Sequence, residues 1–214
     1  MMRSCPRLSR SLAVVESSSL TQSHIVDPDT FEEFVSALAD IVPQVERNMA
    51  RLKRTPTNDA LVNDLFRALH NIKGDAATCR VELGIAIAHP IETLLDRLRA
   101  GEMAFSDLLA EVVLLGLDRL ELAVEAMAAG KQLHSLKLPE LVSGLERMAN
   151  AGEKDLDGLA VKLIESVTGF RPALADAVLR ARSPAAGSPQ AGAEDMAFFR
   201  NLAHQLEARS PLFH

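Results

Sequence analysis

The sequence contains four consecutive amphipathic stretches, and this pattern limits the possible folds more than any other feature. Within each stretch apolar residues recur at steps of three and four, the spacing that places them on one face of an α-helix. These positions are Phe31, Phe34, Leu38, Ile41, Val45, Met49 and Leu52; Leu61, Leu65, Leu69, Ile72, Ala76 and Cys79; Ala88, Ile91, Leu95 and Leu98; and Leu109, Val113, Leu120, Val124 and Met127. Because short turns separate the stretches, we predict an all-α protein in which residues 29–131 form an antiparallel up-and-down four-helix bundle.

Local signals predict where several of these helices begin, bend and end. Thr30 is followed three residues later by Glu33, which is the spacing of a capping box at the start of a helix. Pro43 falls within the first helix and is expected to bend it. Gly101 and Gly130 follow the third and fourth stretches, and glycine is common just after a helix ends.

Composition agrees with an all-helical protein and limits the classes of partner that we expect. Aromatic residues make up only 4 % of the chain, without tryptophan or tyrosine, which argues against a β-sandwich or an α/β fold. Acidic residues outnumber basic ones by 29 to 23, so the formal net charge is -6. Because such a charge does not favour binding to nucleic acid or to an anionic membrane, we expect neither as a partner.

The cysteines and the apolar runs indicate a cytoplasmic protein. Cys5 and Cys79 lie far apart and have no cysteine or histidine at metal-ligand spacing, so the sequence predicts neither a disulfide framework nor a zinc site. No apolar run approaches the roughly 18 residues that a membrane span requires. We expect a cytoplasmic location, with no metal or cofactor bound by this chain.

Composition also divides the rest of the chain into segments. Residues 1–28 are predicted to form a disordered arm, and residues 132–182 a helical extension or connector of shorter helices. Residues 183–193 read SPAAGSPQAGA, which is typical of a linker. Residues 194–214 are again amphipathic and are predicted to begin a further, truncated helical domain.

A histidine on the second predicted helix stands in a setting that suits phosphoryl chemistry. His70 falls beside the apolar stripe rather than within it, so one ring nitrogen is expected to face a docking partner. Lys73 follows by one turn and would place a positive charge where an attached phosphate projects. Gly74 costs on the order of 1 kcal/mol relative to alanine within a helix, which suggests that another surface approaches closely there.

The third predicted helix adds a second histidine and a carboxylate. His89 and Glu92 are three residues apart and share a face that an antiparallel neighbour can turn toward His70. A hydrogen bond from Nδ1–H to Glu92 would fix the tautomer of His70 and leave Nε2 as the nucleophile toward phosphorus. The alternative for both residues is an ordinary solvated helix face.

The strings FRALHNIKGDAAT and AHPIETLLDRLRAGEM resemble the histidine-phosphotransfer domain found at the start of the chemotaxis kinase CheA. The similarity spans about residues 31–131. It implies a site of five residues: His70 as the phosphoacceptor, Lys73 in support of the phosphoryl group, Gly74 leaving room for docking, and His89 with Glu92 orienting the imidazole.

The resemblance also implies a role and a set of partners. The chain would be a phosphocarrier of a two-component phosphorelay and not an enzyme. A histidine kinase or a receiver domain would load His70, and the aspartate of a response-regulator receiver would take the phosphoryl group. ATP and magnesium would then belong to those partners.

The sequence departs from the family pattern at three places. Asp75 stands where relatives usually have a small or hydroxyl residue, and a carboxylate close to a phosphohistidine would repel it unless it points away. Pro90 lies between His89 and Glu92, so it either starts the straight part of the third helix or kinks it. Arg80 ends a turn that lacks the glycine common in relatives.

Two further hypotheses follow from the sequence. The string FFRNLAHQLEARSPLF resembles the lead-in helix of HD-family phosphohydrolase domains, so phosphorylation of His70 would control a downstream output domain. These enzymes need a His-Asp pair, which the sequence does not contain. The main alternative function is a non-phosphorylated adaptor that keeps the bundle and uses the His70 face only to bind a kinase or receiver.

Overall fold

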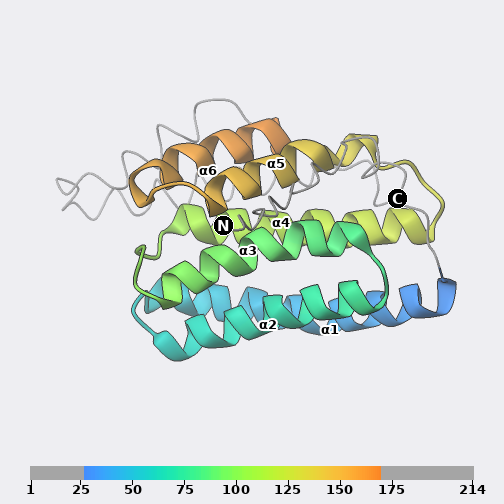
Figure 1. Cartoon of the computed structure of the whole chain (residues 1–214), viewed down its shortest axis with the longest axis horizontal. Helices are drawn as coiled ribbons and strands as arrows, with labels where there is room; N and C mark the ends of the chain where they lie inside the picture. The colour runs from blue at the N-terminus through green and yellow to red at the C-terminus, as the bar shows by residue number, and fades with distance from the viewer. Residues whose placement is uncertain (1–26, 170–214) are drawn as a thin grey trace, which may run out of the picture. The chain divides into compact units, whose positions relative to one another are not determined.

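The computed structural model describes residues 27–169, and every regular element among them is helical (Figure 1). All described residues belong to a single compact unit. The predictions for residues 1–26, for residues 170–182 of the helical extension, for the linker and for residues 194–214 fall outside the described part. The elements are α1 (Pro28–Arg54), α2 (Asp59–Thr78), α3 (Glu82–Arg99), α4 (Asp107–Ala128), the 3-10 turn η1 (His134–Leu136), α5 (Leu138–Ala149) and α6 (Glu153–Thr168).

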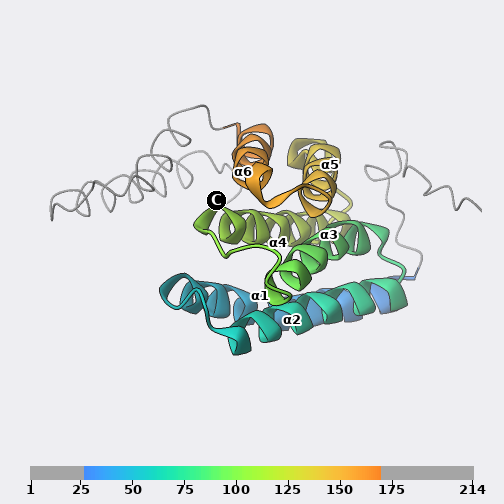
Figure 2. The same cartoon turned by 60° about the vertical axis from the view of Figure 1, so that its left-hand side comes forward.

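Helices α1 to α4 form an antiparallel four-helix bundle. Each of α1 and α3 packs against both α2 and α4, which closes the bundle around one core. Helices α5 and α6 pack on each other and cover α3 and α4, so the helices lie in three layers of two (Figures 1 and 2). This arrangement confirms the predicted all-α bundle with additional C-terminal helices.

The predicted apolar stripes meet in the core, with differences at three positions. Val42 is buried at 3 % exposed, whereas Ile41 is only half-buried. Position 42 lies four residues after Leu38 and three before Val45, so it keeps the stripe on the face that α2 and α4 cover. Leu98, in the last turn of α3, and Met127, in the last turn of α4, are also only half-buried.

Helix α1 begins earlier than predicted. Its N-cap is Asp27, whose Oδ1 accepts a hydrogen bond from the backbone N–H of Asp29 at 3.2 Å. Pro28 follows at the first helical position, where its missing N–H leaves no orphan donor. The capping box at Thr30 was therefore wrong, because Thr30 lies inside the first turn. The helix continues through Pro43 without ending there.

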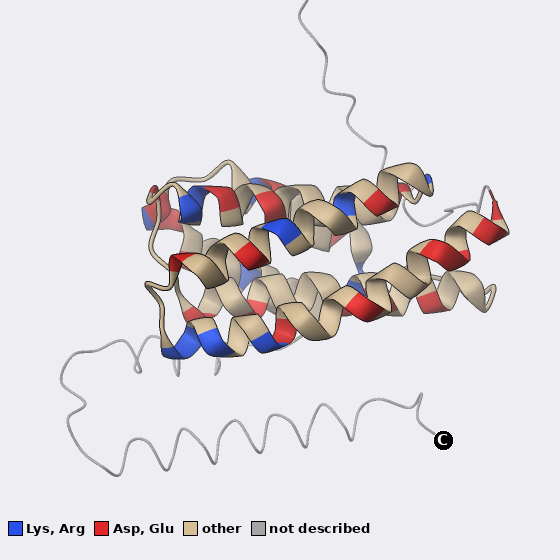
Figure 3. Ribbon diagram, turned by 90° about the horizontal axis from the view of Figure 1, so that it is seen from below, with Lys and Arg blue, Asp and Glu red and all other residues tan. Residues whose placement is uncertain are grey.

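The charges of α1 are distributed according to the helix dipole (Figure 3). Asp29 lies in its first turn, and Arg51, Lys53 and Arg54 lie in its last turn. Acidic groups near the positive N-terminus and basic groups near the negative C-terminus both stabilise a helix. Lys53 also reaches Glu111 of α4, with 2.6 Å between Nζ and Oε1.

The turn between α2 and α3 forms without the expected glycine. Arg80 takes the left-handed conformation at φ +56°, and its N–H donates to the carbonyl of Ala77. The N–H of Val81 donates to the carbonyl of Ala76 at 2.8 Å. This is a Schellman motif with arginine where Gly101 stands in the same motif at the end of α3.

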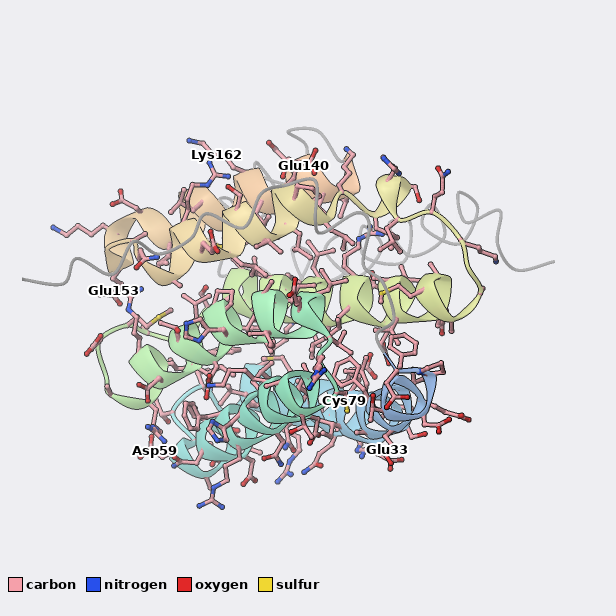
Figure 4. All side chains as sticks on the ribbon, turned by 45° about the vertical axis from the view of Figure 1, so that its right-hand side comes forward. Glu33, Asp59, Cys79, Glu140, Glu153 and Lys162 are labelled. Atoms are coloured by element: carbon pink, nitrogen blue, oxygen red, sulfur yellow. The ribbon has the colours of Figure 1, made fainter. Side chains whose placement is uncertain are left out.

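The α5–α6 pair is tied to the bundle by polar contacts at its connecting loop. Arg97 of α3 donates to the carbonyl of Ala149 at 3.2 Å, close to where α5 ends. Glu153, labelled in Figure 4, accepts a hydrogen bond at 2.9 Å from the N–H of Ala104 in the α3–α4 loop. None of the described helices is both long and apolar enough to cross a membrane.

Replacing Arg80 with glycine should stabilise the protein. A left-handed conformation costs a residue that has a side chain about 1–2 kcal/mol, and glycine avoids this cost. Part of the gain in stability is lost again, because glycine makes the unfolded chain more flexible. We expect Arg80→Gly to raise the free energy of unfolding by about 0.5–1 kcal/mol in urea denaturation. The reverse control, Gly101→Ala, should lower it, although its Cβ would meet nothing within 4 Å. A loss of stability in Arg80→Gly would contradict this account.

Candidate functional site

His70 lies in the middle of α2, at the rim of the core. Its neighbours Leu69 and Ile72 are buried, at 0 % and 1 % exposed, because they belong to the apolar stripe. The His70 side chain points toward the seam between α2 and α3 and remains 60 % exposed. The helix therefore holds the imidazole beside the stripe, as the spacing predicted.

The His70 ring is hydrogen-bonded to Glu92 of α3. The distance from Nδ1 to Oε1 is 2.6 Å, and the Glu92 side chain is only 9 % exposed. An ionised carboxylate has no proton to donate, so the Nδ1 atom must carry the hydrogen. The lone pair then resides on Nε2, on the opposite side of the ring from the buried carboxylate.

Lys73 binds the second oxygen of the same carboxylate. Its Nζ donates to Oε2 of Glu92, and its side chain is 28 % exposed. Burial by itself would raise the pKa of Glu92, but the hydrogen bonds and positive charge from Lys73 and His70 outweigh it and hold the pKa below its ordinary value. Glu92 is thus a buried, ionised group with both oxygens paired.

His89 lies beside this cluster without a hydrogen bond to it. Its Nδ1 is 3.9 Å from Oε2 of Glu92, which is too long for a hydrogen bond, and its side chain is 67 % exposed. The structure therefore brings His70, Lys73 and Glu92 together, and it places His89 on the same face at the edge of the group.

Two glycines of the α2–α3 pair serve different ends. A Cβ on Gly74 would meet nothing within 4 Å, so this position opens onto the surface next to Lys73. A Cβ on Gly84 would lie 2.7 Å from the Cβ of Ala76, so Gly84 allows α3 to approach α2 closely. Sequence reasoning missed Gly84, although a glycine inside an apolar helical run is a signal of close packing.

Pro90 neither starts α3 nor separates His89 from Glu92. The helix begins at Glu82, so Pro90 lies in its interior, where it is buried. Its missing N–H leaves the carbonyl of Ala86 without the usual helical donor. The helix nevertheless keeps His89 and Glu92 on one face.

Asp75 faces away from the His70 cluster. Burial raises the pKa of the Cys79 thiol, and the carboxylates of Glu33 and Asp75 raise it further, so Asp75 lies near Cys79, one turn further along α2. Five residues along a helix correspond to a rotation of about 140° from His70. The carboxylate of Asp75 therefore does not lie beside the imidazole.

Two side chains extend the cluster along the seam. The ring of Phe66 stacks beside His70, with 6.2 Å between centroids and 22° between ring planes. The guanidinium of Arg99 lies over the Phe66 ring, with its Cζ 4.1 Å from the centroid. Phe66 is one helical turn from His70 and follows from spacing, but Arg99 comes from α3 and was missed. Among residues 27–169, no group of three or more histidine, cysteine or acidic side chains is arranged to hold a metal ion.

The Glu92 pairing should make stability depend on pH in the acidic range. Because the folded-state pKa of Glu92 is lowered, its contribution is present above the ordinary glutamate pKa of about 4.3 and is lost as the pH falls through the folded value. The difference in unfolding free energy between wild type and Glu92→Gln should therefore shrink from about pH 5 to about pH 3. Urea denaturation at both pH values measures it. A difference that stays constant would contradict the pairing.

The sequence of this chain is similar to those of known proteins. The family model described as Hpt domain matches residues 29–178. Chemotaxis protein CheA of Cereibacter sphaeroides is 30 % identical over 165 residues, which cover 74 % of this chain and 23 % of that protein. CheA of Treponema pallidum is 30 % identical over 102 residues, covering 48 % and 13 % respectively. This chain therefore spans less than a quarter of the length of these curated relatives.

A solved structure also matches part of the chain. The CheA phosphotransferase domain from Thermotoga maritima is 25 % identical and covers 50 % of this chain and 98 % of that domain, with a TM-score of 0.44. The family match extends through the four helices of the bundle and through α5 and α6. The HD-type resemblance of residues 194–214 lies beyond this match and stays a prediction. The chain belongs to the Hpt domain family, whose members carry phosphoryl groups in two-component signalling.

Proposed function

We propose that His70 is the phosphoacceptor of this Hpt domain. The observation that carries the proposal is the hydrogen bond from Nδ1 of His70 to the buried carboxylate of Glu92. It assigns the proton to one nitrogen and leaves the other as a nucleophile on an exposed ring. A neutral imidazole needs no further base, because its Nε2 lone pair is already available.

The chemistry is a pair of in-line displacements at phosphorus. In the first, Nε2 attacks the γ-phosphorus of ATP held by a kinase; the N–P bond forms while the bond to the ADP oxygen breaks. The ring then carries a positive charge that the Glu92 carboxylate compensates, and Lys73, bound to the same carboxylate, adds a positive charge that favours the incoming phosphoryl group. In the second, a receiver aspartate attacks phosphorus and the N–P electron pair returns to Nε2.

Hpt domains act with kinase and receiver partners, and we propose that both kinds of partner dock on the α2–α3 face around His70. The open position at Gly74 supports this assignment, since no side chain blocks approach there. The chain is a carrier, and ATP, magnesium and the catalytic groups are supplied by the partners. Control of an HD-type output domain by His70 is a separate proposal that relies on residues 194–214 alone.

The adaptor hypothesis loses its main structural support. Asp75 and Pro90 were the residues that argued for it. Asp75 is rotated about 140° around α2 from His70, and α3 continues through Pro90 to Glu92, which still reaches the imidazole. The two functions still make opposite predictions for phosphorylation, so one experiment separates them.

Phosphorylation of variants tests the phosphoacceptor directly. Phosphoramidate donates phosphoryl groups from a P–N bond, so it replaces a kinase that is not yet identified. We expect acid-labile phosphate on wild type and on His89→Ala, and none on His70→Ala, measured by intact mass and phosphorus NMR. His89→Ala is the matched control, because His89 is an equally exposed histidine on the same face. Equal labelling of His70→Ala, or no labelling of the folded wild type, would contradict the proposal.

Replacing Gly74 should affect stability and docking in opposite directions. Gly74→Ala should raise the free energy of unfolding by about 0.5–1 kcal/mol, because alanine is the better helix former and its Cβ meets open space. The same change should slow transfer from phosphorylated His70 to a receiver domain, while loading by the small donor phosphoramidate stays unchanged. Equal slowing of both reactions would show that Gly74 does not act through docking.

A further inference from the structure

A chain of contacts runs from the end of α3 to the imidazole of His70. Asp96 accepts a hydrogen bond from Nη2 of Arg99 at 2.5 Å, and the Arg99 guanidinium lies over the Phe66 ring. This series of contacts ends at His70, whose ring is stacked beside Phe66. The proposed phosphotransfer chemistry assigns no role to Asp96, Arg99 or Phe66.

The Glu92 hydrogen bond alone does not fix the orientation of the His70 ring. It anchors one nitrogen, but a 60 % exposed imidazole held at one atom is still free to tilt about that contact. A second contact on the ring face removes this freedom. Phe66 supplies it from one helical turn away.

Phe66 in turn needs support, because it is itself only half-buried. The guanidinium of Arg99, 4.1 Å from its ring centroid, makes a cation–π contact with it. Arg99 is held in place by Asp96 one turn earlier and by its position in the last turn of α3, where the helix dipole favours a cation.

We propose that Arg99 is a positioning residue that fixes Phe66 against His70 and thereby orients the imidazole for attack on phosphorus. Arg99 does not touch the reacting nitrogen; it acts through Phe66. We call the contact of Arg99 with Phe66, together with that of Phe66 with His70, the clamp. Its purpose depends on the proposed function of His70 as phosphoacceptor. The clamp itself is a property of the unphosphorylated protein and is measured without phosphoryl transfer.

The first arm of the test is NMR of the His70 ring in the unphosphorylated full chain. Phe66→Leu removes the aromatic neighbour and defines the ring-proton shifts without it. Arg99→Met should move the Hδ2 and Hε1 shifts toward those of Phe66→Leu, and Arg99→Lys, which keeps the cation, should move them less. The nitrogen shifts that report the tautomer should stay unchanged, because Glu92 still binds Nδ1. Arg147→Met, which removes an exposed arginine from α5, should change neither.

The second arm is the rate of His70 phosphorylation by phosphoramidate. Loss of a cation–π contact at an exposed site corresponds to a rate change of about two- to five-fold. Phosphorylation of Arg99→Met should therefore be slower by that factor than phosphorylation of either wild type or Arg147→Met. Arg99→Lys should recover part of the rate. Urea denaturation verifies that each variant is folded under the conditions of the assay.

The two arms separate the possible failures. Ring-proton shifts in Arg99→Met that equal those of wild type would overturn the clamp, whatever the rate. A slower rate with unchanged shifts would also overturn it, since Arg99 would then act by its charge and not through Phe66. Altered shifts in a protein whose wild type takes no phosphoryl group would leave the clamp standing and overturn the proposed function.

Discussion

The site depends on a single buried carboxylate, that of Glu92. The Glu92 side chain is only 9 % exposed, and a buried carboxylate is tolerated in a protein when both of its oxygens are paired. Here His70 binds one oxygen and Lys73 the other. The same pairing joins α2 to α3 at the point where the bundle has its reactive side chain. One interaction therefore accounts for the ionised state of Glu92, the tautomer of His70 and the position of Lys73.

The backbone of the α2–α3 pair provides the conditions for this contact. The Schellman turn at Arg80 reverses the chain within three residues, so that α3 runs back along α2. Gly84 then allows the two helices to lie close enough for Ala76 to contact α3 directly. The outer helices α5 and α6 cover α3 and α4 and leave the His70 side of the pair exposed. Packing on one side of the bundle thus supports the reactive side chains that are exposed on the other side.

Helix periodicity was sufficient to predict the bundle and the location of His70, because spacing within one helix decides which residues form its apolar face and which lie beside it. Contacts between helices were harder to predict. The pairing of Glu92 with His70 followed from spacing and resemblance, but the 3.9 Å separation of His89 from Glu92 depends on side-chain rotamers. Arg99 lies 29 residues from His70 in sequence, so no local pattern connects them. At the start of α1, Thr30 and Glu33 have the spacing of a capping box, but the N-cap is Asp27, three residues before Thr30.

The central claim is that Glu92 holds the proton on Nδ1, so that the phosphoryl group is attached at Nε2 of His70. Phosphorus–nitrogen coupling in protein labelled with nitrogen-15 at the imidazole nitrogens identifies the bonded atom directly. The account predicts that phosphorus couples to Nε2 of His70, while Nδ1 keeps its proton and its hydrogen bond to Glu92. Phosphorus coupled to Nδ1, or to a nitrogen of another histidine, would contradict it.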